Sequence, residues 1–244
     1  MATEKRQRKK TGRQARQQAI AAERRRQSRR RTVIATVVVV ALVALVAGLT
    51  GAFSSNSSKN ACPKANGSSP KTTTFAKPPP TCIDPSKTYT ATMKTSQGEL
   101  TITLNPKIAP KTANNFIVLA RYHFYDGVTF HRIVPDFVIQ GGDPKGDGTG
   151  GPGYTIPDEL PQQGQYKIGS VVMANTGQPN SGGSQFFIIT GQQGVQLPPQ
   201  YSLFGQVTAG MDTVQKIAAL GVPGAPNGTP KEKVTIDSVT IQES

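Results

Sequence analysis

The chain is poor in the residue types that most often build active sites. Its 244 residues include two histidines, two cysteines and no tryptophan. The cysteines, Cys62 and Cys82, lie far from His123 and His131 in the sequence, which is not the spacing of a zinc site or of a Cys/His nucleophile pair. No serine stands in a G-x-S-x-G motif. These absences exclude the common hydrolase and zinc-enzyme signatures, and we expect no metal and no other cofactor.

Acidic residues are also few, with 14 Asp and Glu against 28 Lys and Arg, which gives a net charge of +14. The excess is not spread evenly. Residues 1–31 hold 13 Lys and Arg and two Glu, whereas residues 32–244 carry a net charge of only +3. An arginine-rich tail can bind RNA phosphates, but this one has no aromatic residue on which bases could stack. We therefore expect no specific nucleic-acid binding.

Residues 32–53, TVIATVVVVALVALVAGLTGAF, contain no charged residue. About 20 apolar residues span a bilayer as a helix, so this stretch predicts a single transmembrane helix. The basic residues before it predict that the tail 1–31 is cytoplasmic and that the rest of the chain lies outside the cell membrane. A cleaved signal peptide is the alternative, although its basic and apolar parts are usually shorter.

Residues 54–87 are rich in Ser, Thr, Asn, Lys and Pro, and offer few side chains to bury. This composition is typical of a flexible linker. Cys62 and Cys82 both lie in it. An even number of cysteines in an oxidising compartment favours a disulfide between them, and two separate or intermolecular thiols are the alternative.

Residues 88–244 show the pattern of a single mainly-β domain. Short apolar or alternating runs predict strands over 88–95, 98–105, 128–134, 136–140, 168–173, 184–190, 202–207 and 233–241. Helical spacing predicts two helices, over 109–122 and 210–220. Eight short strands without a strand–helix–strand rhythm predict an eight-stranded antiparallel β-barrel capped by two α-helices.

A glycine-rich stretch, GDGTGG at 146–151, matches the G-x-G-x-x-G pattern of nucleotide-binding loops. Pro152 follows it where such loops open a helix, and that context decides the motif. We interpret the stretch as a mobile surface loop.

Three longer motifs point to a function. FHRIVPDFVIQGGD at 130–143 is followed by GTGGPGY at 148–154 and MANTGQPNSGGSQFFIIT at 173–190. In this order they resemble the signature of the cyclophilins, a family of peptidyl-prolyl cis-trans isomerases with an eight-stranded barrel and two helices. The resemblance runs from about Tyr89 to Ile241, and with the predicted anchor it suggests a membrane-bound bacterial member.

The resemblance implies a site. Arg132 matches the catalytic arginine of the family, and Gln140 matches the glutamine that holds a substrate carbonyl and orients that arginine. The proline pocket corresponds to Phe137, Val138, Phe187 and Leu197. The groove for the residues before proline corresponds to Ala174, Asn175 and Gln185. His131 matches a neighbour with a packing or binding role, and Tyr201 replaces a pocket-rim histidine.

Strand periodicity supports only part of this site. Gln185 and Phe187 have the same parity, whereas Arg132 and Gln140 are even-numbered and Phe137 is odd. We therefore expect a bulge at Pro135 to reset the alternation. Four other phenylalanines are expected in the core: Phe116, Phe130, Phe186 and Phe204.

The resemblance predicts an isomerase of X–Pro peptide bonds that assists the folding of secreted or surface proteins. A binding module that holds proline-containing polypeptides without turnover, as a chaperone or scaffold, is the alternative. Nothing in the sequence indicates an obligate dimer, so we expect a monomer.

Overall fold

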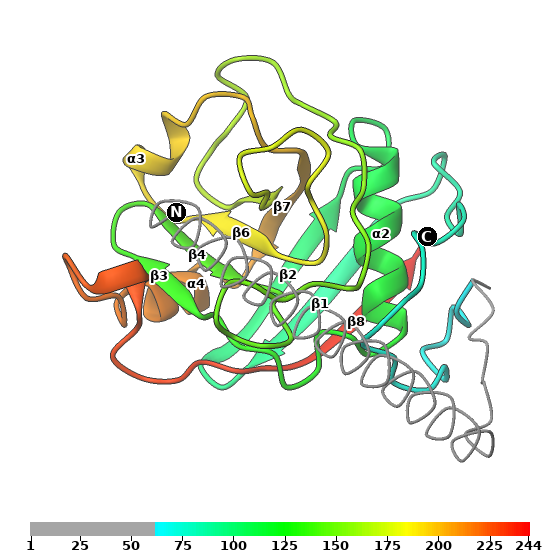
Figure 1. Cartoon of the computed structure of the whole chain (residues 1–244), viewed down its shortest axis with the longest axis horizontal. Coiled ribbons are helices and arrows are strands. Elements are labelled where there is room, and N and C mark those ends of the chain that lie inside the picture. The colour runs from blue at the N-terminus through cyan, green and yellow to red at the C-terminus, as the bar shows by residue number, and fades with distance from the viewer. Residues whose placement is uncertain (1–61) are drawn as a thin grey trace, which may run out of the picture. The chain divides into compact units, whose positions relative to one another are not determined.

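The computed structural model describes residues 62–244 (Figure 1). The predicted tail 1–31, the predicted transmembrane helix 32–53 and the first residues of the predicted linker lie outside this part. Within residues 62–244, no helix combines the length and the apolar character needed to cross a bilayer.

Eight strands form one antiparallel sheet in the order β3-β4-β6-β5-β7-β2-β1-β8. They are β1 (Tyr89–Thr95), β2 (Gly98–Leu104), β3 (Arg132–Val134), β4 (Val138–Gly141), β5 (Ser170–Met173), β6 (Phe186–Ile189), β7 (Leu203–Ala209) and β8 (Ile236–Glu243). Each predicted strand corresponds to one of them, usually a few residues shorter. The mainly-β fold expected from the sequence is therefore confirmed.

The sheet curls until its two edges approach each other. The backbone N–H of Phe130, just before β3, donates to the carbonyl of Val234, just before β8, at 3.0 Å. The Ile236 N–H donates to the Val128 carbonyl at 2.7 Å. These bonds use backbone groups that an open edge would leave unpaired.

The two predicted helices are α2 (Pro110–Arg121) and α4 (Met211–Ala218). They pack on the sheet, α2 against β7 and β8, and α4 against β2, β3 and β4. Two further short helices, α3 (Gln192–Val195) and the 3₁₀ turn η1 (Pro226–Gly228), were not predicted. Both are single turns, too short to show a helical period.

The N-terminus of α2 is capped by a side chain distant in sequence. The residue before the helix, Ala109, has no side chain that could cap it. Instead the Glu159 carboxylate accepts the backbone N–H groups of Lys111 (3.0 Å) and Thr112 (2.8 Å) and the Thr112 hydroxyl. A carboxylate at this position accepts hydrogen bonds from backbone N–H groups that lack a partner within the helix, and its negative charge interacts favourably with the positive end of the helix dipole.

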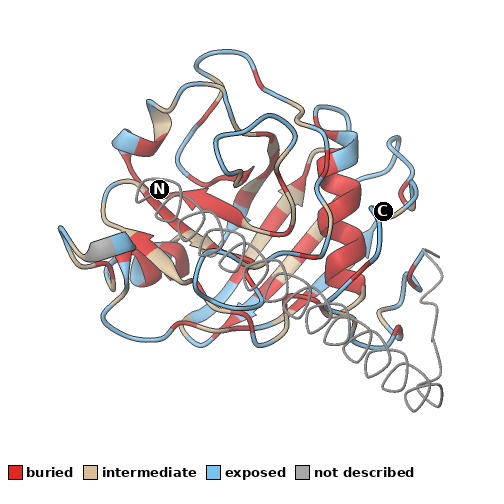
Figure 2. Ribbon diagram, in the orientation of Figure 1, coloured by how far each residue is buried: buried red, intermediate tan, exposed pale blue. Residues whose placement is uncertain are grey.

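The core lies between α2 and the sheet, where buried residues line the helix and strands (Figure 2). Phe116 of α2 is fully buried, and its ring centroid lies 5.0–5.6 Å from those of Tyr125, Phe186 and Phe204. Phe130 is also buried and contacts Phe186. The four phenylalanines expected in the core are all there.

Residues 62–87, which we call the collar, correct the linker prediction. Phe75 and Ile83 are only 9% and 8% exposed and belong to the main hydrophobic cluster. Cys62 and Cys82 are joined by a disulfide, with their Cα atoms 5.3 Å apart. The composition suggested a flexible segment because its few apolar residues are isolated, but two of them reach the domain core.

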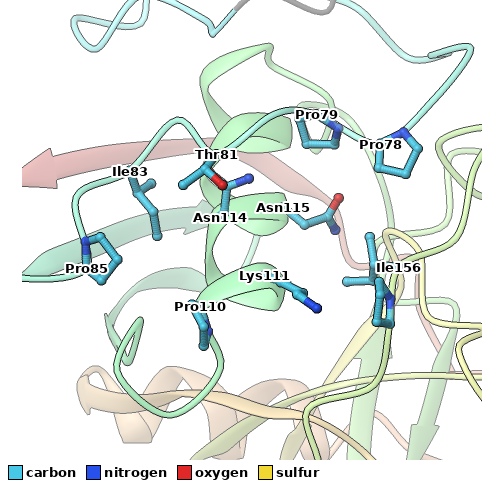
Figure 3. A pocket seen from close by; sticks show the side chains of 11 residues that line it. Pro78, Pro79, Thr81, Ile83, Pro85, Pro110, Lys111, Asn114, Asn115 and Ile156 are labelled. Atoms are coloured by element: carbon cyan, nitrogen blue, oxygen red, sulfur yellow. The ribbon is translucent and has the colours of Figure 1, made fainter.

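Polar contacts hold the collar along α2 and the turn after it. The buried Asn114 side chain accepts the Cys82 N–H (2.7 Å) and donates to the Pro80 carbonyl (2.9 Å). The Thr72 N–H donates to the Tyr122 carbonyl at 2.9 Å. Figure 3 shows Asn114 pointing from α2 toward the collar, in a pocket that Ile83 lines on one side and Ile156 on the other.

Glu243, at the end of β8, is expected to make the stability of the domain depend on pH. Hydrogen bonds from Lys87 and from the buried Arg121 hold the pKa of Glu243 below its ordinary value of 4.5. A lowered pKa contributes stability that is present above the ordinary value and is lost as the pH falls through the folded-state pKa.

We therefore expect the thermal midpoint of the wild type to drop further than that of Glu243→Gln between pH 6 and the acid range below 4.5. Scanning calorimetry of both proteins measures the difference. Parallel pH curves would show that the ion pairs of Glu243 contribute no stability.

Candidate active site

The first of the three motifs, at 130–143, contains a tight hairpin of β3 and β4. Arg132 of β3 lies directly opposite Gln140 of β4, and Val134 lies opposite Val138. Facing residues of an antiparallel pair project to the same side, so Arg132 and Gln140 share the outer face of the sheet. Ile133 and Ile139 also face each other and are buried in the main core.

Phe137 reaches the same site from the turn rather than from a strand. Its N–H donates to the Val134 carbonyl at 3.2 Å, and Asp136 before it has a φ of +55°. Aspartate tolerates this left-handed conformation. The bulge that we expected at Pro135 is therefore wrong: Pro135 begins a hairpin turn, and strand alternation does not apply to Phe137.

The short helix α3 packs on this turn. The Thr190 N–H donates to the Phe137 carbonyl at 3.0 Å, and the Gln192 N–H donates to the Asp136 carboxylate at 3.1 Å. A Cβ atom on Gly194 would lie 2.6 Å from the Phe137 carbonyl oxygen. Only glycine allows this approach, so α3 fixes the position of Phe137.

A second, smaller apolar cluster covers the outer face of the sheet. Its buried members are Val138, Tyr166, Val172, Phe187 and Ile189. Register explains the grouping, because Val138 faces Ile189 across β4 and β6, and Phe187 faces Val172 across β6 and β5. This cluster forms the floor of a surface pocket.

The pocket has a volume of about 230 Å³. Nine of the eleven residues carried over by the resemblance line it: Arg132, Phe137, Val138, Gln140, Ala174, Asn175, Phe187, Leu197 and Tyr201. Phe187 and Tyr201 meet edge to face, with ring centroids 5.3 Å apart. The walls are thus mainly apolar, with a guanidinium and two amides at the edge.

The other two residues lie in adjoining hollows. Gln185 lines a groove of about 540 Å³ that shares Gln140, Ala174 and Asn175 with the pocket. His131 lines another hollow, together with Arg132 and Gln140. The structure therefore places all eleven residues in one continuous region.

Arg132 is half-buried, and its guanidinium carbon lies 5.6 Å from the centroid of the Phe137 ring. Burial lowers the pKa of Arg132, and the phenol of Tyr201 partly opposes this. An arginine is nevertheless always protonated in proteins. None of the ion pairs in residues 62–244 involves Arg132, so its charge is available to a ligand.

A chain of amides connects the pocket to the glycine-rich loop. Gln140 Nε2 donates to Gln185 Oε1 at 3.1 Å. Gln185 Nε2 in turn donates to the carbonyls of Gly148 (3.0 Å) and Gly150 (2.9 Å). The buried Asp143 carboxylate accepts the Gly148 N–H. The loop that we interpreted as a mobile surface loop is exposed, but these bonds hold it against the site.

Comparison with known proteins gives the family. The model of the family described as cyclophilin type peptidyl-prolyl cis-trans isomerase/CLD matches residues 90–241, well over half of the chain. The chain belongs to this family.

Two curated bacterial relatives illustrate the likeness. The chain is 40% identical over 175 residues to the probable peptidyl-prolyl cis-trans isomerase B of Mycobacterium tuberculosis (strain CDC 1551 / Oshkosh), covering 65% of this chain. It spans only 56% of the length of that relative. It is 41% identical over 171 residues to the peptidyl-prolyl cis-trans isomerase B of Streptomyces anulatus, covering 62% of this chain and 95% of that protein.

A solved structure agrees. The cyclophilin type peptidyl-prolyl cis-trans isomerase of Cryptosporidium parvum superposes with a TM-score of 0.59 at 31% identity, and covers 64% of this chain and 99% of its own. The same protein has also been crystallised in the presence of the dipeptide Ala-Pro, and that structure superposes with a TM-score of 0.58.

His131 of this cyclophilin is partly buried beside Arg132. Burial is the main cause that lowers the pKa of its imidazole from the ordinary value of 6.5, and Arg132 adds to it, whereas Asp143 and Asp147 oppose it. The ring is therefore neutral at pH 7. Within residues 62–244, no group of three or more metal-binding side chains is placed to hold an ion.

Tyr166 is a site residue that sequence reasoning missed. Its hydroxyl donates to the Tyr201 carbonyl at 2.7 Å and accepts the Tyr201 N–H at 3.1 Å. Burial raises the pKa of Tyr166 to about 12, which keeps it protonated. Nothing in the stretch around it, GQYKIGS, distinguishes this residue from a surface tyrosine; only the fold brings it below the pocket.

Tyr166→Phe tests this support. The change leaves the partly buried N–H and carbonyl of Tyr201 without the hydroxyl, and a buried group that loses its partner costs about 1–3 kcal/mol at most. We expect a several-fold rise in the KM for an X–Pro peptide. Tyr89→Phe is the matched control. Its hydroxyl accepts the N–H of Asp84 in the collar, and neither residue lines the pocket. Equal KM values for the two variants would contradict the assignment.

Proposed function

We propose that this chain catalyses the cis-trans isomerisation of X–Pro peptide bonds. One observation carries the proposal: Arg132, which takes part in none of the ion pairs among residues 62–244, lies at the edge of an apolar pocket. The family and the curated relatives support the same activity.

The chemistry needs no nucleophile and no proton transfer. The barrier to rotation is about 20 kcal/mol because resonance gives the amide double-bond character. In the twisted amide the nitrogen lone pair is localised and accepts a hydrogen bond. A fixed guanidinium donates to that nitrogen more strongly than to the planar amide, and therefore lowers the barrier.

In this proposal each group of the pocket has a role. The proline ring lies against Phe137, Val138 and Phe187, which holds the nitrogen near Arg132. Gln140 gives one N–H to Gln185, and an amide has two. The second N–H is left for a substrate carbonyl, and the Gln140 oxygen for the guanidinium. Ala174, Asn175 and Gln185 then face the residues before proline, while Leu197 and Tyr201 close the far side.

The direct test is the relaxation of an X–Pro peptide from cis to trans. The uncatalysed process takes tens of seconds at 25 °C, so acceleration is easily measured. We expect a rate that rises in proportion to the concentration of the chain. A rate equal to the uncatalysed one, with peptide binding intact, would leave the alternative of a chaperone or scaffold that holds proline-containing polypeptides.

We further propose that residues 32–53 anchor the chain in the cell membrane as a single span. The tail 1–31 would then be cytoplasmic, and the domain would act outside on secreted or surface proteins. The uncharged stretch, its basic flank and a disulfide close behind it support this arrangement. Tethering would also raise the concentration of the domain near emerging chains.

Alkaline extraction of membranes tests the anchor, and protease added to intact cells tests the orientation. We expect the chain to stay with the membrane pellet and the domain to be cleaved from outside. Release of a shorter, soluble domain would instead indicate a cleaved signal peptide.

Sedimentation of the detergent-solubilised chain tests the expected monomer.

A further inference from the structure

Phe75 of the collar precedes the region that the family model matches, which begins at residue 90. Its side chain is nevertheless buried in the domain. The ring centroid lies 5.4 Å from that of Tyr122 and 6.1 Å, edge to face, from that of Tyr154. Tyr154 belongs to the segment 148–155, which includes the last four residues of the glycine-rich loop, so the collar contacts this segment.

The two backbones are also in direct contact. The Phe75 N–H donates to the Pro152 carbonyl at 2.8 Å. Gly153 has a φ of +98°, and a Cβ atom there would lie 2.6 Å from the Phe75 carbonyl oxygen. Any other residue at Gly153 would therefore be strained and would push the collar away. The contact depends on glycine at this position.

The same segment forms one wall of the groove beside the pocket. All of residues 148–155 line this groove, together with Ala174 and Gln185. Gln185 binds the front of the segment through two carbonyls. Phe75 supports the segment at Pro152, and the Tyr154 hydroxyl donates to Asn115 of α2 at 2.6 Å. The wall is thus fixed both by the domain and by the collar.

We propose that Phe75 is a positioning residue for this groove: it sets the place of the wall at 148–155 and thereby the affinity for the peptide residues that precede proline. This inference rests on the proposed function of the pocket and the groove. Phe75 itself touches no substrate. It acts through Pro152 and Tyr154, so its effect must grow with the length of peptide before the proline.

The experiment compares two peptides with the full chain in mild detergent. One is acetyl-Ala-Pro-amide, which has a single residue before proline; the other has four. A contact that the substrate makes equally in the ground state and in the transition state changes KM without changing kcat, so a shifted wall is measurable through KM. For Phe75→Ala we expect the KM of the long peptide to rise about fivefold with kcat unchanged, and the KM of the short peptide to stay within about twofold.

Two variants separate positioning from general destabilisation. Ile83→Ala removes a collar side chain of nearly equal burial, 8% exposed against 9% for Phe75. Ile83 lines the pocket between the collar and α2 on the side opposite Ile156 (Figure 3). Ile83→Ala should lower the unfolding midpoint without changing the ratio of the two KM values. Phe75→Leu keeps an apolar side chain, so its ratio of the two KM values should stay close to that of the wild type.

The outcomes distinguish the two claims. If Phe75→Ala weakens both peptides equally, or if Ile83→Ala shifts the ratio as much, the positioning role is wrong and the isomerase stands. If the wild type accelerates neither peptide, the proposed function is wrong. Dissociation constants of the same two peptides then give the ratio, and a change confined to Phe75→Ala would still support the positioning role.

Discussion

Replacement of Arg132 by alanine is expected to lower kcat/KM for an X–Pro peptide by about 100- to 1000-fold, the usual effect of removing a donor that acts on the transition state. The proline pocket keeps its apolar walls, so the affinity for the peptide should change only a few-fold. A protease-free assay of cis-trans relaxation by NMR exchange measures both quantities.

Two controls sharpen this result. Lys145→Ala removes a positive charge from the adjoining groove and should leave kcat unchanged. Arg132→Lys keeps the charge but loses the planar set of donors, and should recover little activity. Full activity in Arg132→Ala would contradict the proposed chemistry, whereas an inactive wild type with intact peptide affinity would favour the binding module.

Loss of the disulfide is expected to have the largest effect on stability. The bond closes a loop with a sequence separation of 20 residues, and in the chain-entropy model such a loop stabilises by about 3 kcal/mol. In the variant with Cys62→Ser and Cys82→Ser, the collar should therefore open far more often than in the wild type.

Hydrogen exchange measures this opening residue by residue. The Cys82 and Phe75 amides bond to Asn114 and Pro152, so both report the collar. In the double variant the amides at positions 75 and 82 should exchange roughly 100-fold faster, which corresponds to about 3 kcal/mol. The Ile102 amide, in β2, serves as the control and should change little. Unchanged exchange at Phe75 would show that side-chain packing alone holds the collar.

Local sequence patterns predicted the elements well because alternation and helical spacing reflect which face is buried. All eight strands and both longer helices lie where their apolar periods placed them. The helix α3 and the 3₁₀ turn were missed because a single turn has no period to recognise. The segment at Pro135 was misjudged because a hairpin turn and a bulge interrupt alternation in the same way.

The site residues came from motif resemblance rather than from periodicity. What neither could give were contacts made by residues far apart in the sequence. Glu159 at the start of α2, Tyr166 beneath Tyr201 and Phe75 against Pro152 each sit in stretches without a distinctive pattern. Their roles follow from the three-dimensional fold, which brings separate segments together.

The disulfide has a mechanical consequence. Tension applied to the chain before Cys62 crosses directly to Cys82, and from there to Ile83 and β1. Residues 63–81 lie outside this load path, so force on the N-terminal side does not peel Phe75 from Pro152. With the cysteines replaced, the same pull would run through the whole collar and, after the bonds of Lys71 and Thr72 to the turn behind α2, would load the contact between Phe75 and Pro152 in the groove wall.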